Sequence, residues 1–153
     1  MIKQIHEQLI NLTDDQSLED FISLYSKYSS LLKSHQHTEL LFRSCRLGLL
    51  SFLEYILNSK LIDINCPHPS TGYPLLFLSI QPQKHDIIKY IIQQTNANIN
   101  WSCQNNGITC LNEAIRQSDY STVILLLEHG YAINQSHLFG TIIECFRQDN
   151  KVS

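Results

Sequence analysis

The sequence predicts an all-α fold built from stacked pairs of helices. A repeated ending is the first observation that predicts it: three segments end in Ile-Asn, at Asn65, Asn100 and Asn134, with spacings of 35 and 34 residues. The second observation is that each ending follows a run of apolar residues with helical spacing. A self-similar period of this length is typical of repeat proteins, in which neighbouring units bury a shared core.

The third unit, residues 104–137, has the clearest pattern of a helix, a turn and a second helix. Thr109 is placed to cap a short first helix by accepting a backbone N–H. Ser118 and Asp119 interrupt the apolar pattern before the second helix, and Gly130 supplies the left-handed residue that ends it. The apolar face expected for the second helix consists of Val123, Leu126 and Leu127.

This unit resembles the ankyrin repeat, whose pattern is G-x-T-P-L-H-x-A-A, then G-H, then V-V-x-L-L-L-x-x-G-A-D-V-N. The unit departs from the pattern at Cys110, which replaces a proline, at Asn112, which replaces a histidine, at Ile115, which replaces an alanine, and at Ser118-Asp119, which replaces Gly-His. The matching residues are Gly107, Thr109, Leu111, Ala114, Val123, Leu125, Leu126, Leu127, Gly130, Ile133 and Asn134.

Two further units are looser but in phase. Residues 38–68 and 69–103 repeat the apolar pattern, with small insertions near Pro82 and Thr95 and with Asn96 in place of glycine. Residues 138–150 read as a closing helix with a polar end, as the ends of repeat stacks require. The resemblance therefore implies an ankyrin-repeat solenoid over residues 37–153, in which the first two units stack less regularly than the third.

Residues 1–36 lack the ankyrin motif but contain two amphipathic stretches, at 2–11 and 17–32. The second stretch opens with Ser17-x-x-Asp20, a capping pattern. We expect this segment to be a helical N-terminal cap that covers the first repeat. The alternative is a separate pair of helices that docks onto another protein.

Composition excludes several functional classes. The chain has 153 residues, 43% hydrophobic and 16% charged, with a net charge of −3, which argues against binding the phosphate backbone of nucleic acids. No apolar run approaches the roughly 20 residues that a membrane span needs. Five cysteines without tight spacing fit a reducing compartment. We therefore expect a cytoplasmic monomer with neither nucleic acid nor membrane as a partner.

The sequence contains no phosphate-binding glycine loop, no H-E-x-x-H and no G-x-S-x-G. One donor row, His68, Cys103 and His137, follows the unit endings at a constant offset. Zinc needs ligands about 2.0–2.3 Å from the ion, whereas neighbouring repeats lie roughly 8–10 Å apart. We therefore predict no metal site, no cofactor and no enzymatic activity.

Three kinds of residue that could take part in chemistry are more simply interpreted as structural. Cys110 lies at a helix start, which favours a lowered pKa, although a packed, inert thiol is the preferred interpretation. His129, in the last turn of a helix, is expected to complement the helix dipole. Asn65, Asn100 and Asn134 are expected to bind the backbone of the loops.

The ankyrin resemblance implies that a partner binds the concave face, formed by loop tips and the outer side of each first helix. Trp101 has two interpretations: an exposed binding anchor, or a ring packed onto the second repeat. Leu47 and Ile80 would form an apolar stripe if both are exposed. The residues expected to bind the partner are Arg46, Leu47, Ser70, Thr71, Ile80, Gln81, Trp101, Asn105, Asn106, Ile108, Arg116, Gln117 and Tyr120.

The predicted function is a protein–protein interaction module. Two alternatives place the same module in another context. It could be a bacterial or viral effector that engages a host protein in the host cytosol, which the Ile- and Asn-rich composition favours. It could also be the interaction arm of a larger enzyme.

Overall fold

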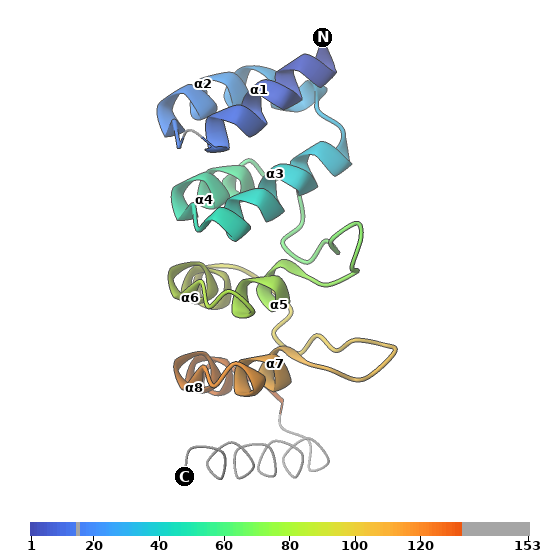
Figure 1. Ribbon diagram of the computed structural model, residues 1–153, viewed down its shortest axis with the longest axis vertical. Helices are drawn as coiled ribbons and strands as arrows, with labels where there is room; N and C mark the ends of the chain where they lie inside the picture. Colours follow the sequence, from blue (N-terminus) through green and yellow to red (C-terminus); the bar gives the residue numbers. More distant parts are fainter. Residues whose placement is uncertain (15, 133–153) are drawn as a thin grey trace. The chain divides into compact units, whose positions relative to one another are not determined.

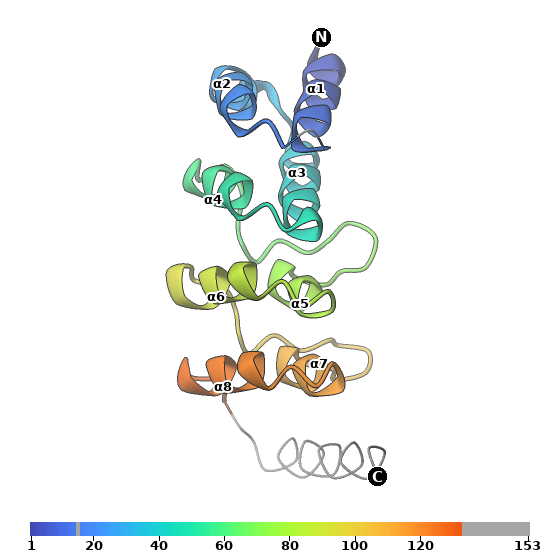
Figure 2. The ribbon, with the colours of Figure 1, turned by 60° about the vertical axis from the view of Figure 1, so that its left-hand side comes forward.

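The computed structural model describes residues 1–14 and 16–132. The expected closing helix 138–150, Asn134 and His137 lie outside these residues. The chain divides into two compact units, Met1–Leu75 and a second that begins at Leu76. Within the described residues the regular elements are eight α-helices and one short 3-10 helix (Figures 1 and 2), which confirms the all-α prediction.

The first unit consists of two helical pairs. The first pair is α1 (Ile2–Asp14) and α2 (Leu18–Tyr28), followed by the 3-10 turn η1 (Ser29–Leu31). The second pair is α3 (Ser34–Leu47) and α4 (Leu50–Asn58). α1 packs on α3 and α2 packs on α4, so the N-terminal pair covers one side of the second pair (Figure 2).

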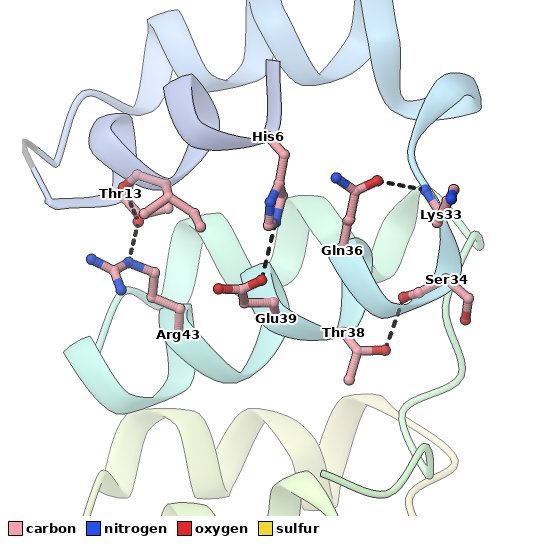
Figure 3. A network of polar contacts seen from close by, with 9 residues as sticks. His6, Thr13, Lys33, Ser34, Gln36, Thr38, Glu39 and Arg43 are labelled. Carbon is pink, nitrogen blue, oxygen red and sulfur yellow. Dashed lines mark hydrogen bonds and ion pairs between the residues drawn. The ribbon is translucent and has the colours of Figure 1, made fainter. Parts of the chain in front are cut away.

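Polar side chains join α1 to α3 at the edge of this packing. His6 on α1 lies 3.4 Å from the Glu39 carboxylate on α3. Two turns further along α1 and one turn further along α3, the Nε of Arg43 donates to the Thr13 hydroxyl at 3.0 Å (Figure 3). Arg43 also pairs with Asp14. These contacts fix how α1 lies along α3.

An aromatic cluster forms the core of the first unit. The Phe21 ring lies 5.5 Å from Tyr25 and 5.0 Å from Phe52, measured between ring centroids. The Tyr25 hydroxyl lies 2.7 Å from Nδ1 of His37, a side chain that is 4% exposed. Burial lowers the pKa of His37 below its ordinary value of 6.5, and nearby His6 lowers it further, while backbone hydrogen bonds at Ser29 and Leu32 oppose this shift.

The second unit repeats the helical pair twice. Its first pair is α5 (Leu75–Ile80) and α6 (His85–Gln94), and its second pair is α7 (Cys110–Arg116) and α8 (Tyr120–Glu128). The apolar side chains of these four helices with the least exposure are Leu75, Ile80, Ile91, Cys110, Ala114 and Leu126, all at 0%. Small Ala114 belongs to α7, which packs against α8.

All four pairs use the same turn. One residue between the two helices of each pair has a left-handed backbone, with φ between 52° and 76°. The next residue donates its N–H to the carbonyl five positions earlier, which is the Schellman pattern. The left-handed residues are Gln16, Gly48, Gln83 and Ser118. The N-terminal pair therefore shares the backbone geometry of the repeats although it lacks their motif.

Helix termini test the capping predictions. Thr109 caps α7 as expected, because its hydroxyl accepts from the Asn112 N–H at 3.1 Å. Gly130 ends α8 with φ of 89°, and the Tyr131 N–H bonds to the Leu126 carbonyl at 3.0 Å. The prediction for Ser17 is wrong: it precedes α2, but only its backbone carbonyl, not its side chain, accepts a hydrogen bond from the helix.

The apolar face predicted for α8 is only partly buried. Leu126 is fully buried, whereas Leu127 is 39% exposed and Val123 is half-buried. The i, i+3, i+4 pattern therefore gives the apolar face of α8 but does not say which edge of it is covered by a neighbour.

The left-handed residues that follow the second helices allow a direct stability test. Lys60 follows α4 with φ of 57°, the position that Gly130 holds after α8. Lys60→Gly should raise the free energy of unfolding by about 0.5 kcal/mol, because relief of about 1–2 kcal/mol of backbone strain exceeds the about 0.4–1 kcal/mol of added chain entropy. Gly130→Ala should lower it by about 1 kcal/mol through backbone strain alone, since a Cβ there meets nothing within 4 Å. Denaturant unfolding measures both, and equal stability of Gly130→Ala and the wild type would contradict the argument.

Buried His37 should make the first unit sensitive to acid. The folded state holds His37 neutral below its ordinary pKa of 6.5, so the unfolded state binds more protons as the pH falls. Stability is therefore full above about pH 6.5 and should decrease as the pH falls below it. Unfolding of His37→Gln between pH 7 and 5 should show a weaker pH dependence than the wild type. Exposed His35→Gln is the matched control and should keep the wild-type dependence.

Candidate functional site

The left-handed turn sets the register of the exposed residues at the ends of the first helices. Arg46 lies two residues before the left-handed residue of its turn in the first unit, and Gln81 and Arg116 hold the same position in the second unit. All three are exposed. One residue closer to the turn, Leu47 is 41% exposed.

Ile80 was wrongly predicted to be exposed. It is 0% exposed and stands three residues before the left-handed Gln83, in the same register as buried Cys45 and Ile115. The error arose because an insertion was assumed near Pro82, whereas the turns at residues 48, 83 and 118 are evenly spaced by 35. The apolar stripe expected from Leu47 and Ile80 is therefore absent.

A short hairpin loop precedes α5 and an equivalent one precedes α7. In the second unit, the Cys103 N–H donates to the Ile108 carbonyl and the Gly107 N–H to the Cys103 carbonyl, both at 2.8 Å. The first unit contains the same pair of bonds 35 residues earlier, between His68, Gly72 and Tyr73. The loop before α7 extends beyond the ends of the helices of the second unit (Figure 1). The predicted loop residues Ser70, Thr71, Asn105, Asn106 and Ile108 are all exposed.

A buried carboxylate organises the end of α7. Glu113 is 3% exposed, and it accepts hydrogen bonds from Arg116 at 2.7 and 3.0 Å and from Gln117 at 2.9 Å. Gln81, from the preceding repeat, also donates to it. Burial raises the pKa of Glu113, but these hydrogen bonds outweigh burial and leave the pKa below 4.5. The carboxylate is therefore ionised at neutral pH and holds Arg116.

A second buried carboxylate, Asp119, caps α8. Its oxygens accept from the Thr122 N–H at 3.1 Å, the Thr122 hydroxyl at 2.6 Å and the Ser121 hydroxyl at 2.7 Å. His85, the first residue of α6, lies 3.1 Å away. Burial raises the pKa of Asp119, but the bonds from Thr122, Ser121 and His85 outweigh this and leave it below 3.8. Asp119 thus joins the starts of α6 and α8 and positions the adjacent Tyr120, which is 53% exposed.

Comparison with known proteins agrees with this repeated geometry. The family model for ankyrin repeats, in three copies, matches residues 40–137. The chain belongs to the ankyrin-repeat family. This confirms the resemblance drawn from the sequence. Among curated proteins, none matches the chain significantly.

The Ile-Asn ending has a structural role in the second ankyrin repeat. The Asn100 side chain accepts from the Ala132 N–H at 2.7 Å, so it bonds to the backbone of the following loop, as expected. The ending is also shaped locally, because the Asn100 N–H donates to the Asn98 side chain at 3.1 Å. The first repeat contains the same local bond, from the Asn65 N–H to Asp63 at 2.9 Å.

Trp101 is half-buried, and its ring centroid lies 5.4 Å from that of Phe77 on α5. This contact supports packing onto the second repeat over a fully exposed binding anchor. Part of the indole nevertheless remains at the surface, beside the start of the hairpin loop.

Among residues 1–14 and 16–132, no group of three or more potential ligands is placed to hold a metal. The lowered pKa expected for Cys110 is wrong: burial raises it to about 12, outweighing the helix terminus. The expected packed thiol is confirmed, since Cys110 is 0% exposed. His68 packs edge-on against Phe42. His129 bonds to the Leu125 carbonyl at 2.9 Å, in the structural role predicted for it.

None of the described helices combines the length and apolar character needed to cross a bilayer. Sequence reasoning missed the two carboxylates, Glu113 and Asp119. A signal for Glu113 was present, since Arg116 and Gln117 follow it at i+3 and i+4, the spacing of interacting pairs on a helix. The contacts with Gln81 and His85 have no such signal, because they join different repeats.

Asp119 should contribute measurably to stability. Asp119→Asn removes the acceptor for the Thr122 hydroxyl and for His85, and should lower the free energy of unfolding by about 1–2 kcal/mol at pH 7. The wild-type contribution is present above pH 3.8 and should be lost as the pH falls through the lowered pKa of Asp119. Denaturant unfolding at pH 7 and pH 3 checks both, and the variant should converge on the wild type at the lower pH.

His85→Ala is the control for this experiment. It removes one hydrogen bond from a side chain that is 54% exposed, so its effect should be smaller than that of Asp119→Asn. An Asp119→Asn protein as stable as the wild type at pH 7 would show that the capping bonds contribute nothing net.

Proposed function

We infer that this chain is a protein–protein interaction module, as ankyrin repeats generally are. We propose that this chain binds a partner protein through its hairpin loops and the exposed ends of its first helices, the parts that form the concave face of ankyrin repeats. The observation that carries the proposal is that exposed side chains stand on loops whose backbones are closed by 2.8–2.9 Å hydrogen bonds.

A closed loop suits binding because little backbone freedom is lost when a partner covers it. At the tip of the second hairpin, the Asn106 side chain accepts from the Ile108 N–H at 3.1 Å, and in the first the Thr71 hydroxyl accepts from the Tyr73 N–H at 3.3 Å. These side chains shape the loops. Asn105, Ser70 and the apolar surface of Ile108 are then presented for contact.

The ends of the first helices add a second set of contacts to each unit. Arg46 and Leu47 are exposed in the first unit. In the second unit, Gln81 and Arg116 are exposed, while Gln117 is half-buried. Tyr120 lies just past the turn, and Trp101 contributes the exposed part of its ring. Ile80 is excluded from this surface because it is buried.

We propose that the chain acts as a cytoplasmic monomer without catalytic activity, cofactor or metal, and that neither nucleic acid nor membrane is its target. The acidic net charge of −3 argues against the nucleic-acid phosphate backbone as the target. An effector and an arm of a larger enzyme would use the same surface, so these alternatives differ in the identity of the partner.

Affinity capture with the full chain, followed by mass spectrometry, identifies the partner, and calorimetry with the purified partner then tests the surface. The double variant Asn105→Ala/Ile108→Ser should weaken binding about tenfold or more, because both side chains are exposed on the tip of the second loop. Its helical circular dichroism and thermal midpoint should be unchanged.

Ile124→Ser is the matched control. Ile124 is 56% exposed on α8, outside the loops and first helices, so its replacement should leave the dissociation constant unchanged. Equal affinity of the loop variant and the wild type, or a larger loss in Ile124→Ser, would place the binding surface elsewhere.

A further inference from the structure

Arg116 is the exposed part of a polar cluster with a buried anchor. Its Nε donates to Oε2 of Glu113 at 3.0 Å and its Nη2 to Oε1 at 2.7 Å. The Arg116 side chain is 61% exposed, whereas that of Glu113 is 4% exposed. The Nε–Nη2 edge of the guanidinium is thus bound to buried Glu113, and the opposite edge faces solvent.

Glu113 has no capacity to spare for other ligands. Its Oε1 also accepts from Gln117 at 2.9 Å, and Gln81 donates to the same carboxylate. A carboxylate has about four acceptor sites. All four are therefore used by donors of this chain, and a partner cannot draw Glu113 away from Arg116.

Arg116 retains donors for which the described residues 1–14 and 16–132 offer no recorded hydrogen bond. A guanidinium has five N–H groups in a fixed planar fork, and Glu113 takes one from Nε and one from Nη2. The remaining three lie on Nη1 and Nη2, which together form a second pair of parallel N–H groups. This edge matches the two oxygens of a carboxylate, the geometry of bidentate recognition.

The surroundings favour a singly charged ligand. Glu113 balances the charge of Arg116, and the amides of Gln81 and Gln117 bond to the same carboxylate. Gln83 is itself bonded to the Gln117 carbonyl at 3.0 Å. A carboxylate, with two oxygens and a single charge, matches one preorganised fork, whereas a phosphate dianion carries more charge than this one guanidinium can balance.

We infer that the Nη1–Nη2 edge of Arg116, held rigid by Glu113, binds an Asp or Glu side chain of the partner protein. This inference rests on the proposed function and names the chemistry that the second unit recognises. A partner that covers Arg116 must supply an acceptor, because a donor left unpaired in an interface loses its hydrogen bonds to water. Immobilisation by Glu113 reduces the side-chain entropy that binding costs.

The test uses a phage library of random 12-residue peptides, selected on the immobilised full chain and in parallel on Arg116→Lys. Lysine keeps the charge but cannot form the bidentate fork. Selection on the wild type should enrich Asp or Glu at one peptide position, and selection on Arg116→Lys should not. Affinities of an enriched peptide are then measured by fluorescence anisotropy.

The enriched peptide should bind about tenfold more weakly to Arg116→Lys than to the wild type. Replacing its enriched acidic residue by the corresponding amide should weaken its binding to the wild type by the same factor. The two changes together should cause no further loss, since both remove the same interaction. Glu113→Gln, which frees the guanidinium, should weaken binding about threefold or more. Lys89→Ala is the control: Lys89 is exposed on α6, outside the loops and the first helices of the proposed surface, so the change should be below twofold.

Peptides without an enriched acidic position, or equal affinity for Arg116→Lys and the wild type, would overturn the inference. If such peptides still lose affinity for Asn105→Ala/Ile108→Ser, the proposed surface stands and only the carboxylate chemistry fails. If neither set of variants weakens them, the proposed surface fails as well.

Discussion

The turn between the two helices of each pair is the constraint on which the other features depend. At residues 16, 48, 83 and 118 the chain adopts a left-handed backbone, and the following N–H closes onto the carbonyl five positions earlier. This turn reverses the chain over two residues and so decides which side of each first helix faces its partner. Backbone atoms make these bonds, so glutamine, glycine and serine all occupy the position.

This dependence explains how far the sequence could predict the structure. The third repeat could be predicted closely because Thr109 and Gly130 signal its helix ends through side-chain chemistry or its absence. The second repeat has Gln83 at its turn, and a glutamine gives no such signal. The position predicted for Ile80 relative to the turn was therefore wrong by one residue. Residues 1–32 have the same turn at Gln16, yet no ankyrin motif predicts it.

Glu113 and Asp119 illustrate a different limit of prediction. They lie on either side of the left-handed Ser118, and each reaches a residue of the preceding repeat, Gln81 or His85. A single sequence shows which residues share a helix but not which polar groups meet across a repeat interface. Together the two carboxylates place charged hydrogen bonds on both sides of that turn, where a shift in register would leave a buried charge unpaired.

In the hairpin loops, backbone hydrogen bonds hold the loop conformation, and the side chains at the tips supply the surface chemistry. The loop at 68–73 contains proline, serine and threonine, and the loop at 103–108 contains glutamine and two asparagines, yet the same two backbone bonds close both. Loop tips can therefore diverge in sequence while the repeats beneath them stay unchanged. A chain of this kind can acquire a new target by substitutions at a few tip positions, and a tip sequence from one repeat could be transplanted onto another without redesigning the core.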